Sequence, residues 1–160
     1  MRDATLCYVV QDSRILLGMK KRGFGVGKWN GYGGKVNAQE TIIQAALREL
    51  TEETTITTEQ DHCEKVAEID FHFADIPAEK NWDQRVHVFI VRKWNGEPAE
   101  TEKMKPQWFH QQDLPLNQMW KDDPYWLPLI FEGKKIKATF TFKKEGEEIA
   151  HHTLASVERF

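Results

Sequence analysis

Alternating and clustered apolar positions along the chain predict several β-strands. Thr5–Val10 is a strand-like run, and a turn at residues 11–13 leads to a second apolar run at Ile15–Leu17. We expect these two runs to pair as a hairpin. The other strand-like runs are Val66–Phe73, Val86–Trp94, Gln107–Phe109 and a closing hairpin of Ile136–Phe142 and Ile149–Val157 around Gly146.

Two segments show helix signals instead. Apolar residues at positions 43, 46, 47 and 50 recur at helical spacing, and Thr41 with Gln44 forms a capping-box pattern, so a helix is predicted from about Thr41 to Thr54. A shorter helix, Tyr125–Phe131, is predicted to follow Asp123-Pro124, with Asp123 as its cap and Pro128 bending or shortening it. Strands and helices do not alternate regularly and most strand connections look like hairpins, which favours an α+β fold over a doubly wound one.

Length and composition narrow the class of protein. The chain has 160 residues, of which 40% are hydrophobic and 29% charged, with a formal net charge of −3. These values predict one globular domain over residues 1–160, and the lack of a basic excess argues against a nucleic-acid polymer as partner. Cys7 and Cys63 lack metal-ligand spacing, and no segment approaches the roughly 20 apolar residues of a membrane span. We therefore expect a cytoplasmic protein with no membrane association, and a monomer because no coiled-coil pattern is present.

The predicted first helix contains three closely spaced carboxylates. Glu49, Glu52 and Glu53 stand at i, i+3 and i+4, which predicts that they project from one face, opposite the apolar stripe. Their mutual repulsion calls for a positive partner: Arg48 reaches Glu52 at i+4, and a hard divalent cation such as magnesium prefers oxygen ligands. From these residues alone, a solvated acidic helix face remains an equal alternative. Six glycines within residues 23–34 precede the helix and indicate backbone that bends sharply or approaches a ligand.

The spacing of these residues resembles the Nudix box. That motif runs from a glycine through a glutamate to Arg-Glu-aliphatic-any-Glu-Glu-any-Gly-aliphatic. The matching residues are Gly34, Glu40, Arg48, Glu49, Leu50, Glu52, Glu53 and Ile56. Thr55 stands where the family has glycine, at a helix exit that adopts a left-handed conformation, so the geometry and stability of that exit are in question.

The resemblance implies a fold and a metal-dependent hydrolysis. Nudix enzymes hold a mixed β-sheet between helices, and their glutamates bind magnesium, or manganese in its place, while water attacks a phosphorus of the nucleotide. Carried over, Glu49, Glu52, Glu53 and the Gly34 carbonyl are metal ligands, and Arg48 orients the carboxylates. Glu52 and Glu53 are candidate general bases, as are Glu100 and Glu102 in the loop that follows Trp94, although these two are equally well read as solvated loop residues.

The resemblance extends over nearly the whole chain to the animal-type branch of the MutT-like Nudix hydrolases. Those enzymes hydrolyse oxidised purine nucleoside triphosphates, such as 8-oxo-dGTP and 2-oxo-dATP, to the monophosphate and pyrophosphate. The segments with this resemblance are residues 18–25, 28–36 and 119–123. The substrate-binding residues that it implies are Thr5, Lys20, Asn30, Phe71, Met104, Trp120, Asp122 and Asp123. Lys103 departs from the pattern, because the animal branch has an acidic residue before its pocket methionine.

The chemistry of these residues suits a purine pocket, but the residues also have simpler interpretations. An indole such as Trp120 stacks on a base, and two adjacent buried carboxyls do not both ionise, so one donates and the other accepts a hydrogen bond. Equally, Trp120 is compatible with core packing and Asp123 with a helix cap. Alternative functions are hydrolysis of a methylated purine triphosphate or a dinucleoside polyphosphate, and nucleotide binding without catalysis.

Overall fold

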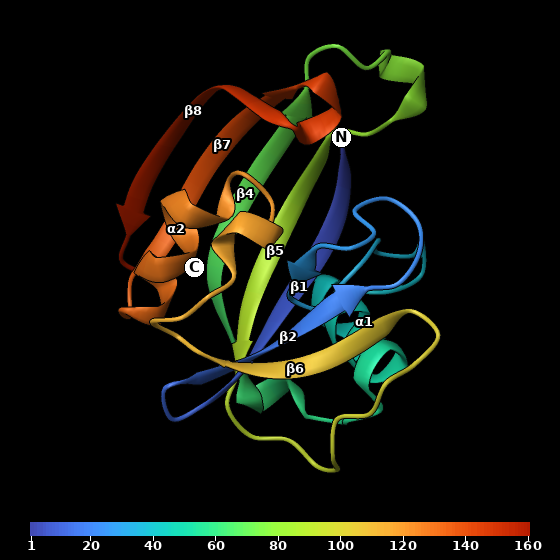
Figure 1. Cartoon of the computed structure of the whole chain (residues 1–160), viewed down its shortest axis with the longest axis vertical. Coiled ribbons are helices and arrows are strands. Elements are labelled where there is room, and N and C mark those ends of the chain that lie inside the picture. The colour runs from blue at the N-terminus through green and yellow to red at the C-terminus, as the bar shows by residue number, and fades with distance from the viewer.

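A mixed β-sheet and two α-helices make up the protein, as the computed structural model of residues 1–160 shows (Figure 1). The helices and strands are β1 (Arg2–Gln11), β2 (Arg14–Lys20), β3 (Trp29–Asn30), α1 (Ile42–Thr54), β4 (Cys63–Phe73), β5 (Gln84–Val91), β6 (Met104–His110), α2 (Asp123–Phe131), β7 (Lys135–Lys143) and β8 (Glu148–Val157). Neither helix is long and apolar enough to cross a membrane.

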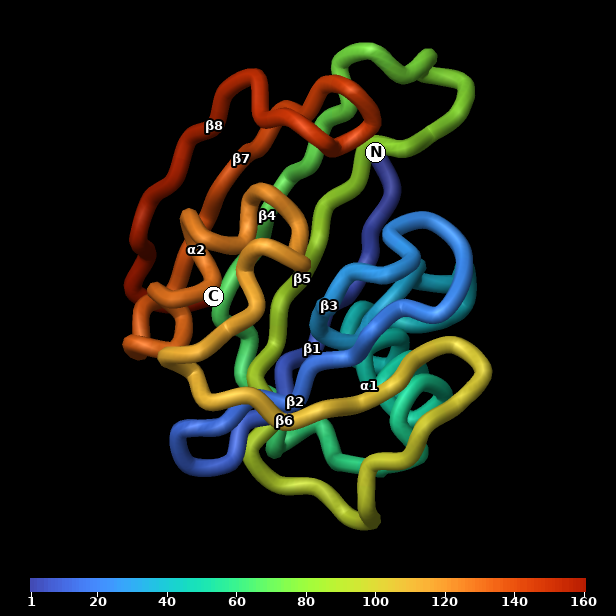
Figure 2. Tube along the Cα trace, viewed as in Figure 1, coloured from blue at the N-terminus to red at the C-terminus, as the bar shows by residue number.

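The strand order places chain segments of distant sequence side by side. The sheet runs β3-β2-β1-β5-β4-β7-β8, and β6 pairs with β2 (Figure 2). Both predicted hairpins are confirmed, since β1 pairs antiparallel with β2 and β7 with β8. The expectation of mostly hairpin-like connections is incomplete, because β1–β5 and β4–β7 are parallel pairs that need crossovers. These parallel pairs bring the N-terminal strand into the centre of the sheet.

Each helix covers one face of the sheet, as the family resemblance implies. Successive side chains of a strand point to opposite faces. Cys7 on β1 packs with Ala46 and Leu50 of α1, whereas its neighbour Tyr8 packs edge-on against Trp126 of α2 at a ring-centroid distance of 6.2 Å. The sheet therefore has an apolar core on both sides and lies between the two helices.

Helix α1 begins and ends as its local sequence predicts. The Thr41 hydroxyl accepts a hydrogen bond from the Gln44 backbone N–H, and the Gln44 side chain accepts one from the Thr41 N–H, which confirms the capping box. At the other end Thr55 adopts φ 71°, in the left-handed region where the Nudix box has glycine. The β-branched residue accepts the conformation rather than moving the helix end.

Several element boundaries differ from the sequence prediction, and two of these differences have a clear physical reason. Helix α2 begins at Asp123, so Asp122 is its cap residue, and neither of the two carboxylates caps a backbone N–H of the helix. A capping residue usually has an extended backbone, whereas Asp122 is already in the right-handed helical region. Its side chain therefore points inward instead of capping the helix. Strand β5 ends at Val91 rather than Trp94, because Asn95 pairs instead with Thr57 in the loop after α1.

Candidate active site

The end of the glycine-rich stretch, residues 32–34, lies against β1. The Thr5 N–H donates to the Gly34 carbonyl over 2.9 Å, and Cys7 and Tyr32 exchange two backbone hydrogen bonds. A Cβ atom at position 33 would collide with the Thr5 carbonyl, so only glycine permits this approach. The Gly34 carbonyl, predicted as a metal ligand, is thus already engaged with β1, whereas the Gly33 carbonyl accepts no hydrogen bond.

Glu53 lies inside the protein and not on the face opposite the apolar stripe, where the sequence pattern placed it. Its side chain is only 8% exposed, and its Oε1 accepts a hydrogen bond from the Gly33 N–H over 2.8 Å. Three residues advance a helix by about 300°, so Glu53 lies about 60° from Leu50 around the axis and shares its buried face. The glycine segment supplies the polar partner that this buried carboxylate requires.

Arg48 is held chiefly by a residue outside the helix. Its guanidinium donates to both carboxylate oxygens of Glu40, over 2.7 and 3.0 Å, and to Glu49 over 2.9 Å. The predicted contact with Glu52 is present but longer, at 3.4 Å. A Cβ atom added to Gly34 would lie 2.7 Å from Oε1 of Glu49, so this carboxylate packs directly on the glycine backbone. Arg48 therefore fixes Glu49 against Gly34.

The other predicted acidic residues point elsewhere. Glu52 is half exposed and accepts a hydrogen bond from Lys103 over 3.2 Å. Glu100 pairs with Lys21 over 2.7 Å, and Glu102 lies 3.8 Å from Arg22. No group of three acidic, histidine or cysteine side chains is arranged to hold a metal ion. The structure thus brings together Glu49 and Glu53 and leaves the remaining acidic residues in pairs with lysine or arginine.

The charges around Glu53 are not balanced. Burial and, after it, the nearby charge of Glu49 raise the pKa of Glu53 to about 7, against the opposing hydrogen bond from Gly33. Burial also lowers the pKa of Lys20, although the two glutamates act in the opposite direction. By contrast, the Arg48 hydrogen bonds hold the pKa of Glu40 down at about 2. Glu53 has no cation in contact with its carboxylate, and with its neighbour Glu49 it fits a divalent cation, which typically takes one or two carboxylates and completes its shell with phosphate oxygens.

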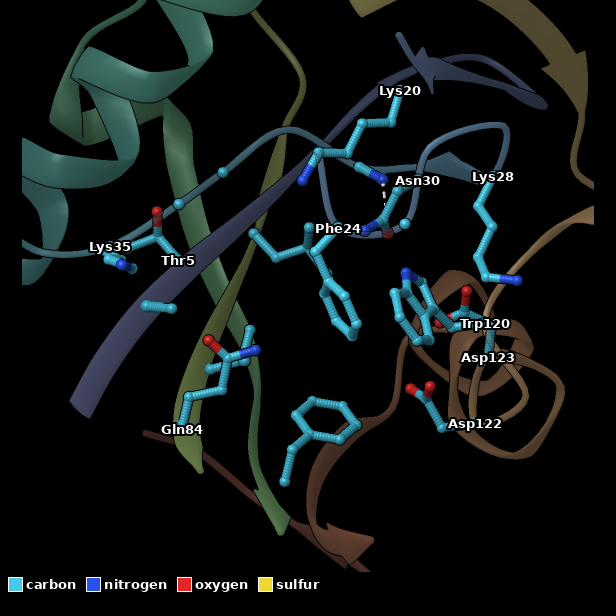
Figure 3. Close-up of a pocket in the computed structure, with 18 of the residues that line it drawn as sticks. Thr5, Lys20, Phe24, Lys28, Asn30, Lys35, Gln84, Trp120, Asp122 and Asp123 are labelled. Carbon is cyan, nitrogen blue, oxygen red and sulfur yellow. Dashed lines mark hydrogen bonds between the residues drawn. The ribbon is translucent and has the colours of Figure 1, made fainter. Parts of the chain in front are cut away.

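A cavity of about 410 Å³ begins beside Glu53 and extends between β1, β4 and the start of α2. Figure 3 shows Thr5 on one side of it, Lys20 and Asn30 along its upper edge, and Trp120, Asp122 and Asp123 on the other side. All eight predicted substrate-binding residues line this cavity, including Phe71 and Met104. They come from β1, β2, β3, β4, β6 and the α2 region, so only the sheet topology brings them together.

Asp122 and Asp123 form the polar end of the cavity. Both are at most 3% exposed. Burial raises the pKa of each carboxyl group, and the charge of Asp122 raises that of Asp123 further. The Trp126 indole N–H donates to Asp122 over 2.8 Å and favours its ionised form, whereas Oδ2 of Asp123 is buried without a partner. Asp123 therefore carries the proton most readily and has an oxygen free for a ligand.

Asn30 is oriented by its own backbone turn. Its side-chain oxygen accepts a hydrogen bond from the Gly31 N–H over 2.9 Å, so its amide N–H₂ group is the part left for a ligand (Figure 3). The hydroxyl of Thr5 is also buried and unpartnered. Both groups line the cavity and have unused hydrogen-bonding capacity.

The sequence analysis did not identify Phe24 and Lys28, which also line this cavity. Phe24 lies with its ring centroid 5.0 Å from that of Trp120, and the Lys28 ammonium lies 5.3 Å from the Trp120 centroid (Figure 3). A large aromatic residue between Gly23 and Gly25 in an exposed loop was the available sequence signal. Its meaning depends on Trp120, which is far away in the sequence.

Comparison with known proteins decides the family. The sequence model of the NUDIX domain family matches residues 1–130. The chain belongs to the Nudix family. A crystal structure of a MutT protein from Bacillus halodurans superposes with a TM-score of 0.76 at 24% identity, covering 96% of this chain and 97% of that one. This likeness confirms the Nudix fold, with its mixed sheet between helices.

Two animal proteins resemble this Nudix chain over nearly their full length. One from Danio rerio is 48% identical, covering 96% of this chain and 94% of the relative, and one from Mus musculus is 43% identical, covering 98% and 96%. Both are named oxidized purine nucleoside triphosphate hydrolase. A MutT Nudix hydrolase from Burkholderia pseudomallei is 30% identical, with a TM-score of 0.61 over 71% of this chain and 86% of that one.

Proposed function

We propose that this protein hydrolyses oxidised purine nucleoside triphosphates, such as 8-oxo-dGTP and 2-oxo-dATP, to the nucleoside monophosphate and pyrophosphate. The observation that carries the proposal is a single cavity with two chemically different ends. Asp122 and Asp123 line one end, and Glu53 with Gly34 lines the other. The named activity of the two animal relatives supports the same substrate class.

The aspartate end is proposed to hold the base. Asp123, protonated, donates a hydrogen bond to an acceptor on the purine, and Asp122, ionised, accepts one from a purine N–H. Oxidation at the 8-position adds a carbonyl oxygen and a ring N–H, which are the groups that such a pair distinguishes from the unmodified purine. The Asn30 amide contributes further donors, while Phe71 and Met104 supply apolar surface.

The carboxylate end is proposed to bind the phosphates together with a divalent cation, magnesium or manganese. Glu49, Glu53 and the free Gly33 carbonyl would hold the ion, with Glu52 able to join after releasing Lys103. When bound, the cation neutralises phosphate charge and favours ionisation of water. Lys20 lines the cavity and is proposed to contact a phosphate, whose charge would offset the burial that lowers its pKa.

The protein's own residues supply positioning and a proton acceptor. Glu40 holds the Arg48 guanidinium in place, and Arg48 in turn holds Glu49. The Gly33 N–H holds Glu53. A water attacks one of the two phosphorus atoms of the α–β phosphoanhydride, the bridging P–O bond breaks to separate the nucleoside monophosphate from pyrophosphate, and the water proton passes to a carboxylate. We propose Glu52 and Glu53 as the carboxylates that take part in this step. The whole chain is proposed to act as one domain, since Phe142 on β7, beyond the family match, also lines the cavity.

The test compares steady-state hydrolysis of dGTP, 8-oxo-dGTP, 2-oxo-dATP and a methylated purine triphosphate by the native protein and by Glu53→Gln. We expect pyrophosphate release that requires magnesium and prefers the oxidised purines. Glu53→Gln is expected to lower kcat by on the order of a thousandfold, because it removes a charge that acts in the transition state. Glu59→Gln, an exposed residue away from the cavity, is the matched control.

The outcomes separate the competing functions. Binding of nucleotide without turnover by either protein would identify a nucleotide-binding module instead of an enzyme. Turnover confined to a methylated purine triphosphate or a dinucleoside polyphosphate would keep the hydrolase and change the substrate. Equal activity of the native protein and Glu53→Gln would show that Glu53 takes no part in the reaction.

A further inference from the structure

Behind the cavity wall formed by Phe24 lies a second aromatic residue that does not line the cavity. The ring centroid of Trp82 is 4.9 Å from that of Phe24 and 5.4 Å from that of Phe73. Phe24 in turn lies 5.0 Å from Trp120, at an interplanar angle of 40°. The three rings form a row, Trp82–Phe24–Trp120, that runs from the protein surface to the base end of the cavity.

The backbone that bears Phe24 gives its ring little support. Phe24 is 48% exposed and stands between Gly23 and Gly25, whose φ angles are +82° and +86°. Lys20 exchanges backbone hydrogen bonds with Gly27 and Lys28 at the base of the loop, and two turn bonds run from the Val26 N–H to the Gly23 carbonyl and from the Lys28 N–H to the Gly25 carbonyl. The backbone of Phe24 itself takes part in none of them. Glycines on both sides leave the backbone many conformations, so the ring position depends on the rings that contact it.

Trp82, by contrast, lies on a loop that is tied down at both ends. Asp83, next to it, accepts hydrogen bonds from the Phe73 N–H and pairs with His72, each over 3.0 Å. At the other end, Asp75 accepts from the Lys144 N–H over 2.7 Å, which ties the loop to the β7–β8 turn beside it (Figure 2). Trp82 is also half-buried against the core. It therefore offers a fixed surface to the Phe24 ring.

We propose that Trp82 is a positioning residue that holds the Phe24 ring against the base end of the cavity and thereby sets affinity for the purine. The proposal rests on the proposed function, because it assumes that the purine occupies this end. Trp82 itself makes no contact with the substrate. Its effect is expected on substrate affinity, since Glu49 and Glu53, at the opposite end, bear the reaction.

The experiment measures kcat and KM for 8-oxo-dGTP, and binding of 8-oxo-dGMP by calorimetry, for Trp82→Ala and Trp82→Phe. An aromatic pair contributes enough for its loss to weaken binding about three- to tenfold, so KM and the dissociation constant are expected to rise by that factor in Trp82→Ala, with kcat within about twofold. Trp82→Phe, which keeps a ring, is expected to restore most of the affinity. Trp94→Ala is the matched control, because Trp94 is a half-buried tryptophan that packs on Trp108 away from the cavity.

A double-mutant cycle with Phe24→Ala separates positioning from a general loss of structure. If Trp82 acts through Phe24, Trp82→Ala has no further effect on KM in the Phe24→Ala background. The same loss of affinity in both backgrounds, or native KM in Trp82→Ala, would overturn the proposal. If Trp82→Ala does not fold, Trp82→Leu, which keeps apolar volume without a ring, undergoes the same cycle. Native protein that binds 8-oxo-dGMP but turns over no oxidised purine would count against the proposed function, and the calorimetric cycle would still decide the role of Trp82.

Discussion

Glu53 shows how one buried residue links stability to activity. Its carboxylate is held by the Gly33 N–H, yet burial and Glu49 raise its pKa to about 7. The unfolded chain releases this proton near the ordinary glutamate pKa of about 4.3. Between these two values the folded state binds more protons than the unfolded state, so this residue makes stability fall as pH rises from about 4.3 to 7.

Replacing Glu53 by glutamine is therefore expected to stabilise the metal-free protein at pH 8 while abolishing activity. The amide oxygen of the new side chain still accepts the Gly33 hydrogen bond and carries no charge, so the free energy of unfolding is expected to rise by on the order of 2 kcal/mol at pH 8 and to change little at pH 4. Urea unfolding in the presence of a chelator measures both values. A gain of equal size at both pH values would show that the effect does not come from ionisation.

The aspartate pair is expected to affect recognition of the base and not the binding of metal. Asp123→Ala removes a buried group with an unpartnered oxygen, which is expected to raise KM for 8-oxo-dGTP by about tenfold or more while leaving the magnesium concentration for half-maximal activity unchanged. Asp123→Asn keeps a neutral hydrogen-bond donor and is expected to lose less. Steady-state kinetics at several magnesium concentrations measure both quantities, and native KM in both variants would exclude Asp123 from base recognition.

At the scale of the elements, the two ends of helix α1 are set in different ways. The capping box at Thr41 follows directly from local sequence, because donor and acceptor are three residues apart. Thr55 adopts φ 71° and so retains the left-handed exit without the glycine that suits it. The exit is held by its surroundings, since the Thr55 N–H donates to the Thr51 carbonyl and the Thr55 hydroxyl to the Glu97 carbonyl.

Thr55→Gly is therefore expected to stabilise the protein by about 0.5–1 kcal/mol, because the strain of a β-branched residue in this region exceeds the entropic cost of glycine. Chemical denaturation measures the difference, and hydrolysis rates are expected to stay near native. Thr57→Gly is the matched control: Thr57 pairs with Asn95 and does not have a positive φ, so the same substitution there is expected to destabilise. Destabilisation by both variants would show that Thr55 is not strained.

The types of the elements were largely predictable from the sequence. Which of their side chains point into the protein was not. The period of apolar residues predicted α1 and both hairpins, since this signal lies within a few neighbouring residues. The same pattern placed Glu53 on the face opposite the apolar stripe, because a charged residue near Leu50 gives no local sign that a glycine segment will cover it. The cap assigned to Asp123 failed for a similar reason, as Trp126 and the cavity determine where these two carboxylates point.

At the scale of the whole molecule, metal binding is expected to couple to pH through Glu53. A divalent cation competes with the proton for this carboxylate, so magnesium is expected to raise the melting temperature more at pH 8 than at pH 5. Thermal unfolding with and without magnesium chloride at both pH values measures the coupling. In Glu53→Gln the magnesium shift is expected to be much smaller at both pH values, and an undiminished shift would place the principal metal site elsewhere.

The sequence alone determined most of the elements, the carboxylate spacing on α1 and, through the family resemblance, the identity of ten of the 24 residues that line the cavity. These features depend on short-range periodicity or on a motif whose members keep a constant spacing along the chain. Only the tertiary structure decided which carboxylates face inward, which carbonyl of the glycine segment is free and which rings support the cavity wall. Those outcomes depend on parallel pairing of β1 with β5 and β4 with β7, which brings residues from distant parts of the chain into contact. Burial and the resulting pKa shifts arise from these contacts and from nothing that a local pattern contains.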